Sequence, residues 1–374
     1  MISSGRWVTL HSWPNRLPYR VWERSVPRIA DYYTHCAVYI YESLADAQGG
    51  EHYGGSGFLC HVSLPNNPKW AELYVVTNWH VVDRAKNPVI RLNRKDGSTE
   101  CVQTNSADWF RHSDGDDVAV FPLRTQYEHL KIWSLHIRNF VTRQLIVDED
   151  IGIGDDTVMI GRFVNHEGKQ KNSPAVRFGN IAMMADETIV TEYGVAQESF
   201  LVEVRSLPGY SGSAVLICSA GSGPGSNDMS VRRKGKSRLG GEIDKINVFE
   251  QANFETLMTF MEPKGPYLLG IDFCHINRKT VVLDRDGNKT EDALYIQENT
   301  GMAGVIPAWK IADVLNGEEL LAMRQKQDEE LTKHIERSSA SLDSADGSNA
   351  LDEFTREDFE SALKKASRKL SSEK

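Results

Sequence analysis

The sequence Leu207-Pro208-Gly209-Tyr210-Ser211-Gly212-Ser213-Ala214 leads directly into the apolar run Val215-Leu216-Ile217-Cys218. A serine between two glycines before a buried strand indicates a tight bend with an exposed hydroxyl. Gly209 can adopt a backbone conformation that other residues avoid. Such a bend would aim the N–H groups of Gly209 and Ser211 at one point, as an oxyanion hole requires, and Gly212 would let a second segment approach closely. Taken alone, however, this pattern is more often a hairpin turn.

Two upstream stretches have the same character, in that each places a polar group at the edge of a strand. The first is Tyr74-Val75-Val76-Thr77-Asn78-Trp79-His80-Val81-Val82, and the second is Asp114-Gly115-Asp116-Asp117-Val118-Ala119-Val120-Phe121. Considered separately, the histidine is more commonly a core residue and the acidic stretch a solvated turn. Their order along the chain, His then Asp then Ser, favours a shared chemical role.

That role is nucleophilic catalysis by Ser211, with His80 and Asp117 as its partners. A serine hydroxyl is a weak nucleophile at neutral pH and needs a base to accept its proton. The base needs a carboxylate that fixes its tautomer and stabilises the imidazolium. Asp114 and Asp116 compete for the acid role, but Asp117 directly precedes the strand and is preferred.

These stretches resemble the motifs of the trypsin/chymotrypsin-like serine peptidases, closest in style to the disulfide-free bacterial members. The resemblance covers residues 30–316, and its motifs occur in the family's order. The matching segments are Gly55-Ser56-Gly57-Phe58, Thr77-Asn78-Trp79-His80-Val81-Val82, Asp117-Val118-Ala119-Val120, Gly209-Tyr210-Ser211-Gly212-Ser213-Ala214, Leu268-Leu269-Gly270-Ile271 and Gly304-Val305-Ile306-Pro307. One departure is Tyr210, because the family usually has Asp or Asn at that position.

The resemblance implies an all-β fold of two antiparallel barrels with a C-terminal helix and a helical or disordered tail. It also implies a serine endopeptidase that works through an acyl-enzyme intermediate on protein or peptide substrates, without a cofactor. The catalytic residues would be His80, Asp117 and Ser211, with the Gly209 and Ser211 amides as the oxyanion hole. A different class remains open: an inactive barrel of the same fold that only binds peptides. Autoprocessing, or cleavage of one fixed partner, is a third interpretation.

The resemblance also places the floor of the specificity pocket about six residues before the nucleophile, at Arg205, with Phe273 and His275 in its wall. A buried guanidinium would select an acidic side chain before the cut bond, held by paired charge-assisted hydrogen bonds. The more ordinary alternative is an outward-facing Arg205, or one paired with Glu203 or Asp272. A one-residue change of strand register decides between these alternatives.

Composition and charge exclude several other classes. The 374 residues are 40% hydrophobic and 25% charged, which is ordinary for a globular protein. The net charge of −9 argues against nucleic acid or an anionic membrane as a partner. No apolar stretch is long enough to span a bilayer, and the N-terminus lacks a secretory signal, so a cytoplasmic location is expected.

The five cysteines fit the same location, since they are odd in number and mostly lie in apolar runs. They are Cys36, Cys60, Cys101, Cys218 and Cys274. Disulfides are therefore not expected. No Cys-x-x-Cys pair is present, and the adjacent Cys–His pairs do not have metal-ligand spacing, so no metal site is expected.

The expected organisation is an N-terminal extension, a peptidase domain and a tail. Residues 1–30 form the extension, and residues 31–316 form the domain, with its first barrel at about 31–125 and its second at about 140–308. A long insertion, 219–265, opens with a Gly/Ser-rich linker and contains a basic run that is either solvated, a processing site or a dock for an acidic partner. Residues 317–374 form a charged helical tail with a disordered linker at 338–350. A regulatory protein partner would bind the insertion or the tail.

Short strands separated by turn signals support a barrel architecture. In the first half they are expected at 36–41, 57–62, 74–77, 88–92, 99–104 and 118–123, and in the second half at 142–147, 157–163, 175–183, 199–204, 213–218, 266–274 and 302–306. Helices are expected at 309–315 and 318–337, with apolar helical spacing also at 249–261 and 354–370.

Overall fold

A computed structural model describes residues 29–68, 70–125, 127–162, 170–190, 196–204, 209–217, 266–282, 287 and 294–343. The chain divides into two compact units. One unit comprises residues 1–61 and 73–315, and the other comprises residues 62–72 and 316–374. The expected extension, insertion and tail helix at 354–370 lie outside the described residues, so these expectations stay predictions.

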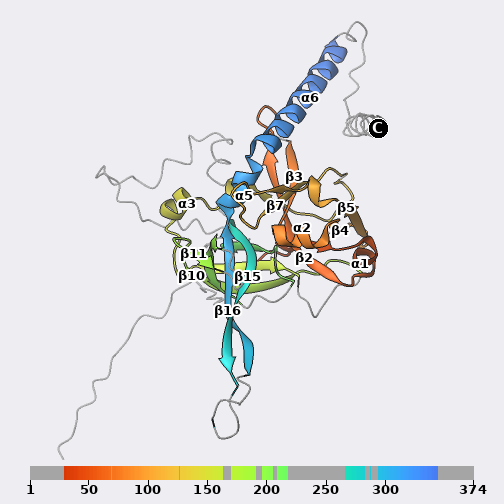
Figure 1. Cartoon of the computed structure of the whole chain (residues 1–374). Coiled ribbons are helices and arrows are strands. Elements are labelled where there is room, and N and C mark those ends of the chain that lie inside the picture. The colour runs from red at the N-terminus through yellow and green to blue at the C-terminus, as the bar shows by residue number, and fades with distance from the viewer. Residues whose placement is uncertain are drawn as a thin grey trace, which may run out of the picture. The chain divides into compact units, whose positions relative to one another are not determined.

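The first half of the larger unit is built on an eight-stranded sheet with the order β5-β4-β1-β2-β3-β7-β6, in which β8 pairs in parallel with β2 (Figure 1). The end strands β5 and β6 do not pair with each other within the described residues. The strands are β1 (Ala37–Tyr41), β2 (Tyr53–Ser63), β3 (Ala71–Thr77), β4 (Val89–Asn93), β5 (Thr99–Gln103), β6 (Phe110–Arg111), β7 (Ala119–Pro122) and β8 (Leu135–His136).

The second half is a closed antiparallel barrel with the order β10-β13-β16-β15-β14-β9. Its strands are β9 (Asp156–Gly161), β10 (Ala175–Met183), β13 (Phe200–Glu203), β14 (Ala214–Ile217), β15 (Tyr267–Val281) and β16 (Tyr295–Pro307). A separate small sheet pairs β11 (Thr188–Val190) with β12 (Ala196–Glu198). The closed barrel, the first sheet and a following helix confirm the mostly β, trypsin-like double-barrel architecture.

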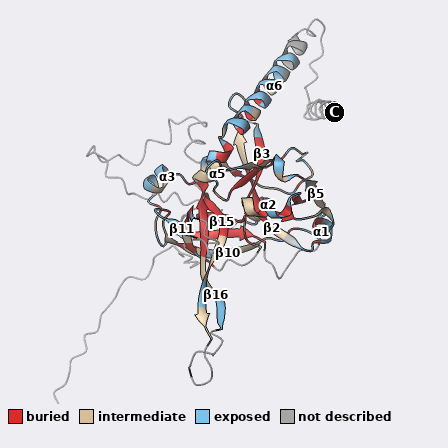
Figure 2. Cartoon of the chain, viewed as in Figure 1, coloured by how far each residue is buried: buried red, intermediate tan, exposed pale blue. Residues whose placement is uncertain are grey.

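Burial follows the apolar composition of the strands (Figure 2). All five residues of β1 and all four of β14 are buried, which explains why both read as continuous apolar runs. Each half has its own hydrophobic cluster, one around Val75 and Leu59 and the other around Val215 and Val305. The two halves therefore have separate hydrophobic cores.

The helices of the larger unit are short. They are α1 (Leu44–Gly49), α2 (Trp79–Ala85), α3 (Arg143–Asp148) and α5 (Ala308–Leu315), with 3₁₀ turns at Asp31–Cys36, Ser106–Asp108 and Ile137–Asn139. The strand expected at 142–147 is wrong, because α3 occupies these residues. The β-branched and apolar side chains favoured a strand. Thr142 instead caps a helix, with its Oγ1 accepting from the Leu145 amide at 3.0 Å.

The smaller unit contains helix α6 (Glu318–Asp343), which continues six residues into the segment expected to be a linker. Its buried Asp328 accepts hydrogen bonds from the Asn66 amide at 2.7 Å and from Asn67 Nδ2 at 2.6 Å. These bonds hold the segment that carries Asn66 and Asn67 against the helix. Within the described residues, no helix is both long and apolar enough to cross a membrane.

The turn that carries Ser211 depends on Gly212. This glycine has φ +93°, and a Cβ at its position would lie 1.9 Å from the Ser56 carbonyl oxygen and 2.6 Å from Thr77 Oγ1. Gly154 has a similar φ of +95° but has nothing within 4 Å of its would-be Cβ. Comparing the two glycines therefore distinguishes the cost of the left-handed backbone from the cost of the close contact with Ser56.

We predict that Gly212→Ala lowers the free energy of unfolding far more than Gly154→Ala. The left-handed backbone alone costs about 1–2 kcal/mol. The clash with the Ser56 carbonyl should raise the total for Gly212→Ala to about 3–5 kcal/mol. Urea denaturation of the full chain measures both values. Equal losses in the two variants would contradict the close approach.

Candidate active site

His80 and Asp117 are brought together by the pairing of β3 with β7. Thr77, the last residue of β3, lies opposite Ala119, the first residue of β7. His80 follows Thr77 by three residues, in the first turn of α2, and Asp117 precedes Ala119 by two. Because the strands are antiparallel, the last residue of β3 and the first residue of β7 lie side by side at the same end of the strand pair. Strand register therefore fixes this pair.

The Asp117 carboxylate holds His80 through two hydrogen bonds. Asp117 Oδ2 lies 2.6 Å from His80 Nδ1, and Oδ1 accepts from the His80 backbone amide at 2.8 Å. A carboxylate at Nδ1 keeps the proton on that nitrogen and leaves Nε2 as the acceptor. The His80 side chain is 36% exposed and that of Asp117 is 19% exposed. The imidazole can thus reach a substrate while its carboxylate partner is shielded.

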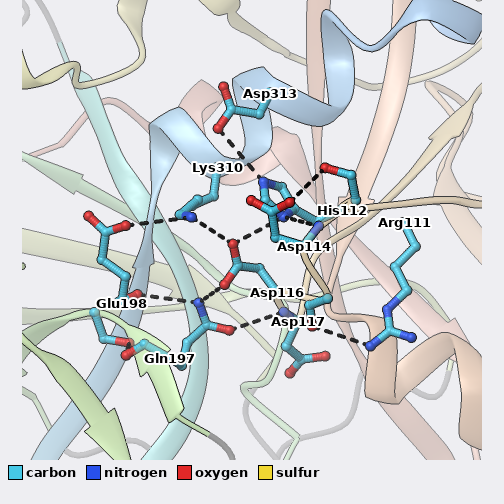
Figure 3. A network of polar contacts seen from close by, with 12 residues as sticks. Arg111, His112, Asp114, Asp116, Asp117, Gln197, Glu198, Lys310 and Asp313 are labelled. Carbon is cyan, nitrogen blue, oxygen red and sulfur yellow. Dashed lines mark hydrogen bonds and ion pairs between the residues drawn. The ribbon is translucent and has the colours of Figure 1, made fainter.

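Asp114 to Asp117 form a segment that we call the acidic loop. Its other two aspartates, Asp114 and Asp116, are directed away from His80. The Asp116 carboxylate lies 2.8 Å from Lys310 Nζ and 2.6 Å from Gln197 Nε2, as Figure 3 shows. The exposed Asp114 carboxylate instead accepts from the Ser113 hydroxyl at 3.3 Å. Among the three candidates, Asp117 is the one whose carboxylate contacts His80.

The charges around Asp116 and Lys310 stabilise one another. Burial disfavours ionisation of Asp116, but hydrogen bonds from Lys310 and Gln197 outweigh it and hold the Asp116 pKa below its usual value. Burial likewise disfavours the charged Lys310, yet the Asp116 and Glu198 carboxylates raise the Lys310 pKa. Both groups are therefore charged at neutral pH.

Ser56 on β2 holds the Ser211 turn through its backbone and its side chain. The Ser56 amide donates to the Ser211 carbonyl oxygen at 2.8 Å, and Ser56 Oγ donates to the Gly209 carbonyl oxygen at 2.9 Å. Ser56 Oγ also accepts from the Arg162 amide at 3.0 Å. The Ser56 carbonyl accepts from Thr77 Oγ1 at 2.7 Å, three residues before His80. One buried residue thus links the serine turn to the strand that presents the histidine.

The turn carries Gly209 and Ser211, whose amides are expected to form the oxyanion hole. Gly209 has φ +93°, and the carbonyls of Gly209 and Ser211 are both engaged by Ser56. The N–H groups of Gly209 and Ser211 donate to none of the described residues, in contrast to that of Gly212, which donates to the Asp272 carbonyl at 2.9 Å. That these two amides bind an oxyanion stays a prediction.

Val81 and Ser211 lie against the same point of β2. A Cβ on Gly55 would be 2.8 Å from Val81 Cγ2 and 3.2 Å from the Ser211 carbonyl oxygen. Since Val81 directly follows His80, the serine turn and the histidine helix meet there. No hydrogen bond joins Ser211 Oγ to His80 Nε2 among the described residues, and in substrate-free enzymes such bonds are often long.

Of the three residues expected to line the specificity pocket, the structure describes Phe273 and His275. Phe273 is 7% exposed on β15, and His275 is partly buried two residues further along the strand. Arg205, the expected pocket floor, lies outside the described residues, so the preference for acidic substrates stays a prediction. Within the described part of the chain, no group of three or more His, Cys, Asp or Glu could hold a metal ion, and Cys36 and Cys101 are free thiols.

Tyr210 replaces the family's acidic or amide residue and is fully buried. Its hydroxyl accepts a hydrogen bond from Arg177 Nε at 2.8 Å, and the Arg177 guanidinium also lies 4.9 Å from the centre of the Tyr210 ring. Burial raises the Tyr210 pKa, so the hydroxyl is neutral at physiological pH. A guanidinium on β10 therefore already stabilises this position of the serine turn.

Neither a family model nor a curated protein matches the chain. The solved structures with weak similarity include the following three. The MamO protease domain from Magnetospirillum magneticum is 12% identical with a TM-score of 0.43, and the match covers 77% of this chain and 99% of that one. Deg5 is 16% identical with a TM-score of 0.33, and the match covers 50% of this chain and 76% of that one. The HtrA-type protease AlgW with a decapeptide is 13% identical with a TM-score of 0.34, and the match covers 75% of this chain and 65% of that one. Because these similarities are low, the fold assignment rests on the strand pairing.

We predict that Ser56→Ala destabilises the protein through the serine turn. The change leaves the Gly209 carbonyl and the Arg162 amide without the Ser56 hydroxyl, at a cost of about 1–3 kcal/mol. Ser98→Ala is the matched control, since the Ser98 hydroxyl bonds only the exposed Asp96 side chain and should change stability by less than about 0.5 kcal/mol. Denaturant unfolding compares them, and equal effects would contradict the role assigned to Ser56.

Proposed function

We propose that this protein is a serine endopeptidase. The observation that carries the proposal is the double hydrogen bond between His80 and Asp117 beside the turn that carries Ser211. An ordinary core histidine or solvated acidic turn would not need this arrangement. The fold supports the proposal, because residues from both barrels meet at their shared boundary.

The geometry supports a two-step hydrolysis. Ser211 Oγ attacks the scissile carbonyl carbon while His80 Nε2 takes the hydroxyl proton. The Gly209 and Ser211 amides stabilise the oxyanion, and Asp117 stabilises the imidazolium. The tetrahedral intermediate collapses, the C–N bond breaks, and His80 gives its proton to the leaving amine. Water, deprotonated by His80, then hydrolyses the acyl-enzyme and restores the Ser211 hydroxyl.

An inactive peptide-binding barrel is the second candidate. The observation that favours it is Tyr210, which stands where the resembled peptidases have Asp or Asn and is held by Arg177. The two candidates differ in one measurable property, which is the appearance of new N-termini in a peptide or protein mixture. Comparing the N-termini produced by the wild-type chain with those produced by Ser211→Ala decides between them. New termini with the wild type alone support the peptidase, and identical sets of termini contradict it.

We predict that Ser211→Ala and His80→Ala each abolish nearly all turnover, with little further loss in the double variant. Residues that act as one unit are strongly non-additive. Asp117→Asn should fold normally but lose on the order of 10⁴-fold in kcat, because an amide favours the wrong histidine tautomer. Asp114→Asn is the control and should retain full activity. Peptide hydrolysis rates test these values; independent, multiplying losses for Ser211 and His80 would refute a shared triad.

We also predict that cleavage near the N-terminus does not activate the enzyme. In the secreted relatives that the sequence resembles, an acidic residue beside the serine binds a newly formed N-terminal ammonium. Tyr210 has no carboxylate, and the Arg177 guanidinium already donates to its hydroxyl. Removing residues 1–28 should therefore leave kcat/KM unchanged in a peptide assay, with trimmed Ser211→Ala as the background control. A sharp rise in activity on trimming would contradict the claim that Tyr210 prevents activation by a new N-terminus.

A further inference from the structure

The backbone of Asp117 is held by side chains from both halves of the chain. From the first half, Asn78 Nδ2 donates to the Asp117 carbonyl oxygen at 2.9 Å. From the second half, Gln197 Oε1 accepts from the Asp117 amide at 3.1 Å. Since the Asp117 carboxylate has its direction set by this backbone, both contacts control how it meets His80.

Gln197 bonds the acidic loop through both polar atoms of its side-chain amide, and its Nε2 also donates to the Glu198 carbonyl oxygen at 3.4 Å. While its oxygen accepts from the Asp117 amide, its Nε2 donates to Asp116 Oδ1 at 2.6 Å (Figure 3). The residue lies on β12 and is 1% exposed. A buried amide that bonds two consecutive residues fixes the loop's position and its rotation, because neither bond can be exchanged for one with water.

Lys310 supports the same loop from helix α5. Its ammonium lies 2.8 Å from Asp116 Oδ2 and 3.5 Å from Glu198 Oε2. Glu198 also pairs with Arg143, whose guanidinium lies over the Trp309 ring. The Lys310 side chain is 17% exposed and that of Asp116 is 13%, so solvent screens this pair less than a surface pair.

His112 closes the network on the first-barrel side. Its buried ring has Nδ1 at 3.1 Å from Asp116 Oδ2 and Nε2 at 3.7 Å from Asp313 Oδ2, one turn of α5 beyond Lys310. The His112 amide donates to the Val118 carbonyl at 3.3 Å, which ties the two ends of the loop together. Asp116 therefore receives contacts from Gln197, Lys310 and His112, while its neighbour Asp117 faces His80.

We propose that Gln197 and Lys310 are positioning residues that hold the acidic loop so that Asp117 orients His80. The proposal rests on the proposed peptidase function and extends it, because the small β11–β12 sheet and helix α5 then support the His80–Asp117 pair. Neither residue touches the substrate or the reacting atoms. Their loss should lower the fraction of molecules with a correctly held imidazole, and thus lower kcat rather than raise KM.

The experiment measures two properties of the full-length chain: peptide hydrolysis, and the low-field proton NMR signal of His80 Nδ1–H. That signal reports the bond to Asp117 and is assigned by its loss in His80→Asn. The test variants are Gln197→Leu, which removes both hydrogen bonds, and Lys310→Met, which removes the charge with little change in length. Their controls are Gln144→Leu and Lys333→Met, which alter an exposed hydrogen bond to Asp148 and an exposed pair with Glu329.

Gln197→Leu should shift or broaden the His80 signal and lower kcat by about 10- to 100-fold with little change in KM, since a misplacement of about 1 Å costs this much. Lys310→Met should act in the same direction but less strongly. The double variant should lose less than the product of the single losses, because both residues act through Asp116. The controls should match the wild type in both measurements.

A purely structural role predicts a different result: lower stability with kcat and the His80 signal unchanged. That result in Gln197→Leu or Lys310→Met would overturn the proposal. If Gln197→Leu does not fold, Gln197→Glu provides the test, since it keeps an oxygen for the Asp117 amide but repels Asp116 and should still perturb the signal. If the wild type hydrolyses no peptide, the peptidase proposal fails by itself. The response of the His80 signal then still supports or overturns the positioning role.

Discussion

The arrangement of the site depends on the hydrogen bonds of Ser56. Its amide and hydroxyl bind two carbonyls of the serine turn, at Ser211 and Gly209, and its own carbonyl accepts from Thr77 at the end of β3. A buried backbone group without a hydrogen-bond partner lowers the stability of the fold. These three hydrogen bonds therefore hold the turn against the first barrel. The left-handed Gly212 permits the approach, because any side chain there would meet the Ser56 carbonyl. Ser211 and His80 thereby lie at one boundary, although 131 positions separate residues 80 and 211.

The His80–Asp117 contact has a different physical origin, namely strand register. The opposition of Thr77 and Ala119 places His80 beside Asp117 before any side-chain contact is considered. Polar contacts then refine the position: Asn78 holds the Asp117 carbonyl and Gln197 holds its amide. Hydrophobic packing builds each barrel separately, and hydrogen bonds at the boundary set the geometry between them.

The sequence allowed most strands to be predicted, since apolar runs are local properties. The motifs also indicated the His80–Asp117 contact that the structure shows, while the role of Ser211 stays a prediction. The segment 142–147 was wrong because its β-branched residues favoured a strand while Thr142 caps a helix. Ser56 lay in a quoted motif, yet its bonds to a turn 153 residues away leave no local pattern. Gln197 and Lys310 were missed for the same reason, because a glutamine in a short strand and a lysine in a helix have no distinctive spacing. Contacts between segments far apart in the chain required the structure.

The most direct test is covalent labelling with a fluorophosphonate, which reacts with a serine only when a histidine activates it and an oxyanion hole holds the phosphoryl oxygen. The modified residue is located by peptide mass spectrometry of the full-length chain. The account predicts labelling at Ser211, lost in His80→Ala and strongly reduced in Asp117→Asn. Absence of label on Ser211 in the folded wild-type protein, or equal labelling in His80→Ala, would contradict the claim that these residues form one catalytic unit.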